Sequence, residues 1–282
     1  MLSVFAAICL GIPFDDAPAV WMIRSRTKAE GLQTEKVVET RFDWSPTKTA
    51  IVVIDMWDDH HCKSAAARVT EMAPAMNETL RAARKLGVLV IHSPSDCADF
   101  YKDHPARKRA LAAPKVEAPM KFQWIYFDAK REAGLAAKIE EGGCSCDTPE
   151  PCSPSVRKWT KETPLLEIDA EKDVVSADGQ EVFNVLKTRG IDTVVLMGVH
   201  TNRCVLGRPF GIRQMVKLKE AGELKTVVLC RDLTDSYHRD PGKHFEGLRE
   251  IVAHVERHWC PTIESTAFTK KPAFRFKGDQ TR

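Results

Sequence analysis

Four short apolar runs constrain the fold of this 282-residue chain more than any other feature. They are rich in valine, isoleucine and leucine, and they span residues 49–55, 88–92, 193–197 and 226–230. Runs of this length and composition are typical of strands buried in the middle of a parallel sheet. Segments with helical spacing separate them. The alternation predicts an α/β fold in three layers, with a mostly parallel, doubly wound sheet covered by helices on both faces.

The segments between these runs predict the helices. Apolar residues at helical spacing indicate helices over residues 74–86, 178–187, 204–218 and 244–258, and residues 165–168 indicate one further short strand. Residues 93–164 form a long irregular stretch, rich in proline and aromatic residues, with one helix expected near residues 129–139. A stretch this long in a compact domain is usually functional or an insertion.

Charge and composition exclude several classes of partner. The formal net charge is only +3, and basic residues are scattered among acids, so we expect no nucleic acid as a partner. No apolar run is long enough to span a bilayer, and no glycine-rich phosphate-binding loop follows a strand. We therefore expect a small-molecule substrate and no membrane partner. A homo-oligomer is also expected.

The chain begins with an apolar segment, residues 2–12, followed by small residues at 17–19. This pattern favours an export signal over residues 1–19, which would place the protein in the periplasm or outside the cell. No lysine or arginine precedes the segment, so an ordinary N-terminal segment of a cytoplasmic protein is the alternative. After it we expect an extension over 20–47, one domain over 48–268 and a C-terminal tail over 269–282.

Three of the nine cysteines lie together in a loop rich in glycine and proline: Cys144, Cys146 and Cys152. A disulfide would suit an exported protein. A zinc site is less favoured, because the usual pairing of two cysteines three positions apart is missing. The loop is therefore expected to hold a disulfide or thiols, with the pairing left open.

Chemically active side chains follow the predicted strands. Asp55 ends the first run, His92 and Asp96 follow the second, and Cys204 follows the third. Ligands of open parallel sheets bind at the carboxyl ends of the strands, so these residues are expected to share one edge. Cys204 begins a predicted helix, where the helix dipole favours the reactive thiolate. The alternative is a buried structural cysteine.

Three separated motifs, in order, resemble those of the isochorismatase-like cysteine hydrolases, the superfamily of nicotinamidases and N-carbamoylsarcosine amidases. Residues 50–57 resemble the strand that carries a catalytic aspartate, and residues 172–176 the segment that carries a catalytic lysine. Residues 190–205 resemble the nucleophile motif. The resemblance covers roughly residues 48–266 of the chain.

The resemblance implies a role for each matched residue. Cys204 would attack a carbonyl carbon, Asp55 would accept its proton, and Lys172 would stabilise the thiolate. The peptide bond between Val199 and His200 would be cis, and the backbone N–H groups of His200 and Cys204 would form the oxyanion hole. The reaction would be hydrolysis of a small amide or carbamoyl C–N bond through a covalent acyl-enzyme.

The chain departs from the nicotinamidases at their metal site. Those enzymes bind a metal through an aspartate and a histidine two residues later, but here Asp96 is followed by Ala98. We expect no cofactor to be required. A divalent metal such as zinc, bound by His60, His92 and Asp96, is the alternative to histidines that are simply hydrogen-bonded near the pocket. The substrate pocket is expected to be lined by Trp57, His60, His92, Asp96 and Thr201.

Two other readings of the sequence stay open. Some isochorismatases lack the cysteine and hydrolyse a vinyl ether, and the fold could also serve a binding protein without catalytic activity. Arg203, Arg208 and Arg213 follow the nucleophile closely. They would bind a substrate carboxylate, or they would pair with acids on the surface.

Overall fold

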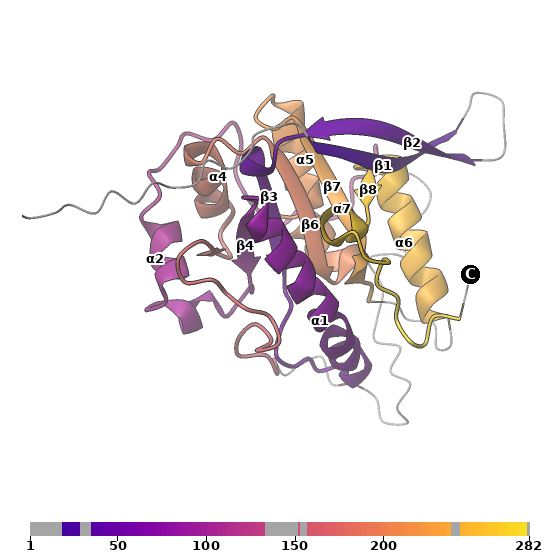
Figure 1. Cartoon of the computed structure of the whole chain (residues 1–282), viewed down its shortest axis with the longest axis horizontal. Coiled ribbons are helices and arrows are strands. Elements are labelled where there is room, and N and C mark those ends of the chain that lie inside the picture. The colour runs from indigo at the N-terminus through magenta and orange to yellow at the C-terminus, as the bar shows by residue number, and fades with distance from the viewer. Residues whose placement is uncertain (1–18, 29–34, 133–151, 153–156, 238–242, 281–282) are drawn as a thin grey trace, which may run out of the picture.

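The computed structural model describes residues 19–28, 35–132, 152, 157–237 and 243–280. Its centre is one eight-stranded sheet with the strand order β2-β1-β8-β7-β6-β3-β4-β5 (Figure 1). The strands from β8 to β5 in this order run parallel, whereas β1 pairs antiparallel with both of its neighbours. The strands are β1 (Ala19–Lys28), β2 (Glu35–Trp44), β3 (Thr49–Ile54), β4 (Leu89–Ser93), β5 (Val174–Val175), β6 (Thr193–Val199), β7 (Thr226–Asp235) and β8 (Thr262–Ile263).

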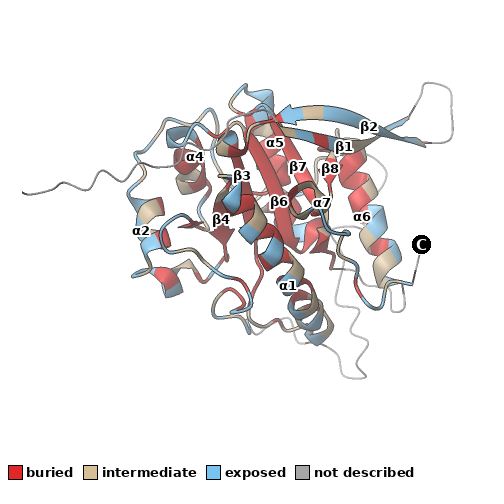
Figure 2. Ribbon diagram, viewed as in Figure 1, coloured by how far each residue is buried: buried red, intermediate tan, exposed pale blue. Residues whose placement is uncertain are grey.

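Two apolar clusters cover the two faces of the sheet. Alternate residues of β3 divide between them, so that Val52 and Ile54 pack on one face and Ile51 and Val53 on the other. One face holds α4 (Gly179–Thr188), α5 (Ile212–Glu220) and part of α6 (His244–His258), and the other holds α1 (Lys63–Lys85) and α7 (Thr266–Thr269). Figure 2 shows the central strands buried between these layers. The predicted three-layer α/β fold is confirmed.

Some predicted elements differ from those observed. Residues 165–168 form no strand, and the strand beside β4 is the two-residue β5, too short to show a pattern in the sequence. The helix expected to begin at Pro74 begins at Lys63 and contains that proline. The helix expected over 204–218 is interrupted: a π-type turn, η3 (Thr201–Val205), precedes α5, which begins only after Gly211.

The long stretch after β4 contains more regular structure than the sequence indicates. Short helices η2 (Ala98–Tyr101) and α2 (Pro105–Leu111) follow β4 directly. Of the helix expected near 129–139, residues 129–132 form a turn and the rest lies outside the described residues.

The segment predicted as an N-terminal extension belongs to the sheet. β1 and β2 form a hairpin, and β1 pairs with β8 at Arg24 and Thr262. The ring of Trp21 stacks on that of Trp44 at 4.0 Å, which attaches the base of the hairpin to the core. The short helix η1 (Pro46–Lys48) then leads into β3. Among the described residues, no helix is both long and apolar enough to span a membrane.

Gly198 lets β6 approach β3 closely just before the turn that carries Cys204. Its φ is +114°, and a Cβ atom there would lie 2.0 Å from the carbonyl oxygen of Ile54. We expect Gly198→Ala to lower the free energy of unfolding by roughly 3 kcal/mol or more, measured by urea titration. Gly222→Ala is the matched control: its φ is +82° and nothing lies near its Cβ position, so about 1 kcal/mol is expected. Equal losses in the two variants would show that contact with Ile54 is not what requires a glycine.

Candidate active site

The structure brings Asp55 and Cys204 together at the carboxyl ends of β3 and β6. Asp55 follows β3 with a φ of +51°, and its side chain is fully buried. Its Oδ1 accepts a 2.8 Å hydrogen bond from the backbone N–H of Ser95, and the Cys204 thiol is hydrogen-bonded to the same carboxylate. A buried carboxylate is thus within reach of the thiol proton.

The backbone before Cys204 is arranged around its sulfur. The peptide bond Val199–His200 is cis, as the resemblance implies, and the N–H of His200 donates to the Cys204 sulfur. Thr201 points elsewhere: its hydroxyl bonds Thr234 and the carbonyl of Asp235, so it anchors the turn to β7. The backbone N–H of His200 therefore faces the sulfur, whereas the Thr201 hydroxyl is engaged by β7.

The resting thiol keeps its proton. Burial raises the pKa of Cys204 well above its usual range, and the negative charge of Asp55 raises it further. Arg208 and the His200 N–H lower the pKa of Cys204, but they do not cancel the effects of burial and of Asp55. The helix-terminus argument for a resting thiolate is thus outweighed by burial, and Cys204 needs a base at the moment of attack.

Arg208 is the cation at this site. Its Nε lies 3.1 Å from Oδ2 of Asp55, its Nη2 lies 3.4 Å from Oδ2 of Asp96, and its guanidinium lies over the ring of Trp124. The residue belongs to the segment between η3 and α5, and its backbone N–H donates to the carbonyl of Cys204. The sequence indicates this role only through the position of Arg208, four residues after Cys204. That spacing places the side chains of Cys204 and Arg208 on one side of a helical turn.

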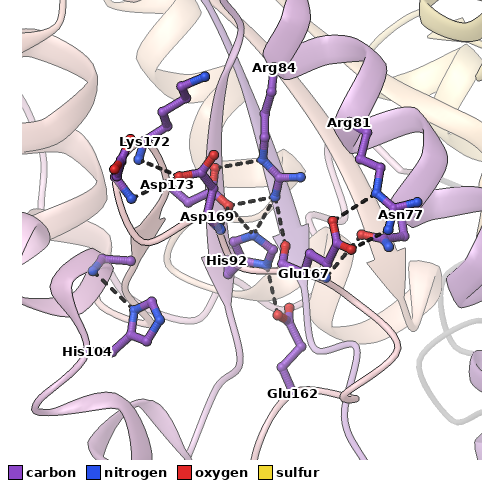
Figure 3. A network of polar contacts seen from close by, with 12 residues as sticks. Asn77, Arg81, Arg84, His92, His104, Glu162, Glu167, Asp169, Lys172 and Asp173 are labelled. Atoms are coloured by element: carbon purple, nitrogen blue, oxygen red, sulfur yellow. Dashed lines mark hydrogen bonds and ion pairs between the residues drawn. The ribbon is translucent and has the colours of Figure 1, made fainter.

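Lys172 does not lie at this site. It precedes β5 and lines a surface pocket with Thr47, Gly87 and Leu89, which mark the amino ends of β3 and β4. Its backbone N–H donates to Asp169 within a turn (Figure 3). The predicted assignment of the cationic role to Lys172 is therefore corrected: the strand β5 separates it from the carboxyl edge, where Ser176 follows instead.

His92 belongs to a buried ionic network, not to a metal site or an open pocket. Its Nδ1 lies 2.8 Å from Glu162 and its Nε2 lies 3.1 Å from Asp173, which also pairs with Arg84 of α1 (Figure 3). Both ring nitrogens are thus engaged. Burial opposes a charged imidazole, but the two carboxylates outweigh it and raise the pKa of His92 to about 9.

The ionic network around His92 should make the free energy of unfolding depend on pH. The pKa of His92 in the folded protein lies above its usual value near 6.5. The stabilisation that protonated His92 gives to the folded state is therefore complete below pH 6.5 and is lost as pH rises through 9. We expect the free energy of unfolding, from urea titrations at pH 6, 7.5 and 9.5, to fall over this window. In His92→Gln, stability is expected to be lower at pH 6 and the fall to be smaller. An equal fall in both proteins would contradict the assignment.

An aromatic cluster lies beside the nucleophile turn. Trp57 stacks on Trp159 at 4.2 Å, and His60 stacks against both rings and meets His200 edge-on. Burial lowers the pKa of His60 to about 2 and that of His200 to about 4, so both are neutral near pH 7. The Nδ1 of His60 accepts from the backbone N–H of Cys62. A cavity of about 10 Å³, room for one water molecule, lies between these histidines and α1.

The three candidate metal ligands are not brought together. Within the part of the chain that the structure describes, no three histidine, cysteine or acidic side chains gather as a metal would require. His92 is held by its two carboxylates, and Asp96 is half exposed, with a φ of +65°. The donor set of His60, His92 and Asp96 therefore does not fit a metal ion.

The other two arginines serve the fold. Arg213 is buried and forms a bidentate pair with Glu132, which also contacts His254. The guanidinium of Arg203 lies over the ring of Tyr237. Of the predicted disulfide loop, Cys144 and Cys146 lie outside the described residues, and Cys152 packs against the small cluster that contains Cys62 and Tyr237.

Several solved structures are similar to this chain. A cysteine hydrolase from Pseudomonas syringae pv. phaseolicola 1448A has 14% identity over 82% of this chain and 94% of its own, with a TM-score of 0.44. An isochorismatase family protein from Burkholderia thailandensis has 15% identity over 79% and 95%, with a TM-score of 0.42. The N-carbamoylsarcosine amidase from Thermoplasma acidophilum has 15% identity over 77% and 96%, with a TM-score of 0.39.

No protein-family model matches the sequence, and a search of curated proteins finds no match. At the identities found among solved structures, the likeness by itself assigns no activity to the chain.

Proposed function

We propose that the chain is a cysteine-dependent hydrolase that cleaves the C–N bond of a small amide or carbamoyl compound, as a member of the isochorismatase-like superfamily. The observation that carries the proposal is the contact of a buried carboxylate, Asp55, with both a thiol and a guanidinium. The backbone N–H of His200 is also directed at the sulfur of Cys204. A buried thiol, acid and arginine with a purely structural role would not require this contact.

Asp55 acts as the base. As the sulfur of Cys204 forms a bond to the carbonyl carbon, the thiol proton passes to the Asp55 carboxylate. The carbonyl oxygen becomes an oxyanion, which the backbone N–H groups of His200 and Cys204 stabilise. Asp55 then gives the proton to the leaving nitrogen, the C–N bond breaks, and an acyl- or carbamoyl-enzyme remains.

Hydrolysis of the covalent intermediate repeats these transfers with water. The Asp55 carboxylate takes a proton from water as its oxygen attacks the acyl carbon. The C–S bond breaks, the proton returns to the sulfur, and the acid is released. Each proton is returned within the cycle, so no oxidant, reductant or cofactor is consumed.

Arg208 supplies the positive charge that Lys172 cannot. Burial raises the pKa of Asp55, and Arg208 opposes this increase more than any other group. The guanidinium also lowers the pKa of Cys204. Its permanent charge therefore favours the ionised form of Asp55, which is the form that acts as a base, and stabilises the thiolate that forms during attack. The contact with the ring of Trp124 helps to hold the guanidinium in place.

A substrate panel tests the reaction class. The full chain is incubated with small primary amides, N-carbamoyl compounds and vinyl ethers, and release of ammonia or of the acid is measured. The proposal expects turnover of at least one C–N substrate and none in Cys204→Ala. Turnover of vinyl ethers alone, or activity that survives in Cys204→Ala, would overturn it.

A further inference from the structure

The outer side of β2 is an open sheet edge. β2 ends the strand order, and the described residues contribute no second partner to it beside β1. The strand is ten residues long, and every residue from Lys36 to Arg41 is exposed. Figure 2 shows the hairpin of β1 and β2 extending away from the buried centre of the sheet. An edge of this length presents a row of backbone groups that can pair with another strand.

Exposed apolar side chains gather on the same hairpin. Val37 and Val38 of β2 and Val20 and Met22 of β1 are four of the nine large hydrophobic residues that are exposed among the described residues. Such concentration on one projecting element is characteristic of surfaces that bind another protein. The charged residues of β2 oppose indiscriminate pairing, so the partner must match their order.

We propose that the β2 strands of two copies of this chain pair antiparallel, across a two-fold axis at Thr40. Side chains that lie opposite each other in an antiparallel pair must point to the same side of the sheet. Successive residues of one strand point to opposite sides, so the two-fold axis must pass through a residue of β2 and cannot pass between two residues. Centring on Thr40 places Glu39 opposite Arg41 of the second copy, twice. It also places Val38 opposite Phe42, and the overlap runs from Lys36 to Trp44.

Neighbouring registers are less favourable. A centre at Glu39 would place the two Glu39 side chains opposite each other, and a centre at Arg41 would do the same for arginine. Like charges opposed in a sheet are destabilising. Centres at Val38 or Phe42 avoid this but shorten the overlap to seven or five residues of the strand, as read from its bounds. The pairing of opposite charges and the length of the strand overlap together favour a two-fold axis at Thr40.

The side chains needed for this pairing are available. The one ion pair of Arg41 within the described part of the chain is with Asp43, where the two side chains are 69% and 60% exposed, and such pairs are worth little. Glu39 lies opposite Arg24 of β1, but the Nε of Arg24 is bound to Glu256 of α6 at 2.6 Å. The structure shows no ion pair for Glu39 among the described residues, so both charges can turn to a second copy.

Charge complementation tests the proposal on the full chain. The wild type is expected to be dimeric by sedimentation equilibrium at micromolar concentration. Glu39→Arg and Arg41→Glu are each expected to weaken the dimer at least about tenfold, because each places like charges opposite each other twice. An equimolar mixture is expected to restore dimers, because two positive charges at positions 39 and 41 of one variant then face two negative charges at the same positions of the other.

Three outcomes would overturn the proposal: a wild type that stays monomeric at up to tens of micromolar, a dimer that neither substitution weakens, or a mixture that stays monomeric. The mixture also separates pairing from damage, since a hairpin loosened by Glu39→Arg would not be repaired by mixing. Glu250→Arg, an exposed change on α6, is the matched control and is expected to leave the dimer unchanged. Activity is expected to be the same in every variant while the chain is folded, because β2 is separated from β3 by four strands.

Discussion

Cys204→Ala is expected to abolish turnover of any substrate of this chain, with a loss of kcat/KM on the order of 10⁴-fold or more. The physical reason is that no other described thiol touches Asp55 through a hydrogen bond and also receives a backbone N–H at its sulfur. Asp55→Asn is expected to have a loss of similar size, because an amide cannot accept the thiol proton. Steady-state kinetics on the best substrate of the panel gives both values.

Trapping of the intermediate separates loss of chemistry from loss of folding. An aldehyde analogue of the substrate is expected to form a thiohemiacetal with Cys204. Native mass spectrometry, without any reduction step, would show this adduct as an increase in the mass of the protein. Neither Cys204→Ala nor Asp55→Asn should form it, although both should show wild-type circular dichroism. Cys97→Ala is the matched control: it is another buried cysteine near Asp55, and its activity should stay within about threefold.

The parallel core was predictable from sequence for a specific physical reason. The residues of β3 and β6 are buried on both faces, so each run is continuously apolar and stands out from its surroundings. Asp55 and Cys204 follow directly, and the geometry of parallel strands brings them to one edge. By contrast, β2 carries charges on an exposed edge and β5 contains two residues, so neither has a pattern by which it could be recognised.

The cationic residue could not be identified from spacing alone. Lys172 lies four residues before Ser176, as the resemblance requires, but the intervening residues form β5, which separates the two along the strand direction. Arg208 stands among several arginines with similar surroundings in the sequence. The three-dimensional structure shows that Arg208, in the turn between η3 and α5, reaches Asp55, and that Arg213, in α5, pairs with Glu132.

Replacement of Arg208 is expected to have a large effect on catalysis, and replacement of Lys172 almost none. Arg208→Ala leaves the Asp55 carboxylate buried without its cation, so kcat/KM at neutral pH is expected to fall about 10²- to 10³-fold. Arg208→Lys keeps the charge but loses the planar contact with Asp55 and Trp124, and it should recover part of the activity. Lys172→Ala is expected to stay within about twofold of the wild type, because its side chain lies at the opposite edge of the sheet.

The pH profile distinguishes an electrostatic role for Arg208 from a merely structural one. Arg208 lowers the pKa of Asp55, so its removal raises that pKa, and more base is needed to ionise the carboxylate. The acid limb of kcat/KM against pH should therefore move to higher pH in Arg208→Ala and return toward the wild-type position in Arg208→Lys. An unshifted limb in Arg208→Ala, or a large loss of activity in Lys172→Ala, would assign the cationic role to another residue.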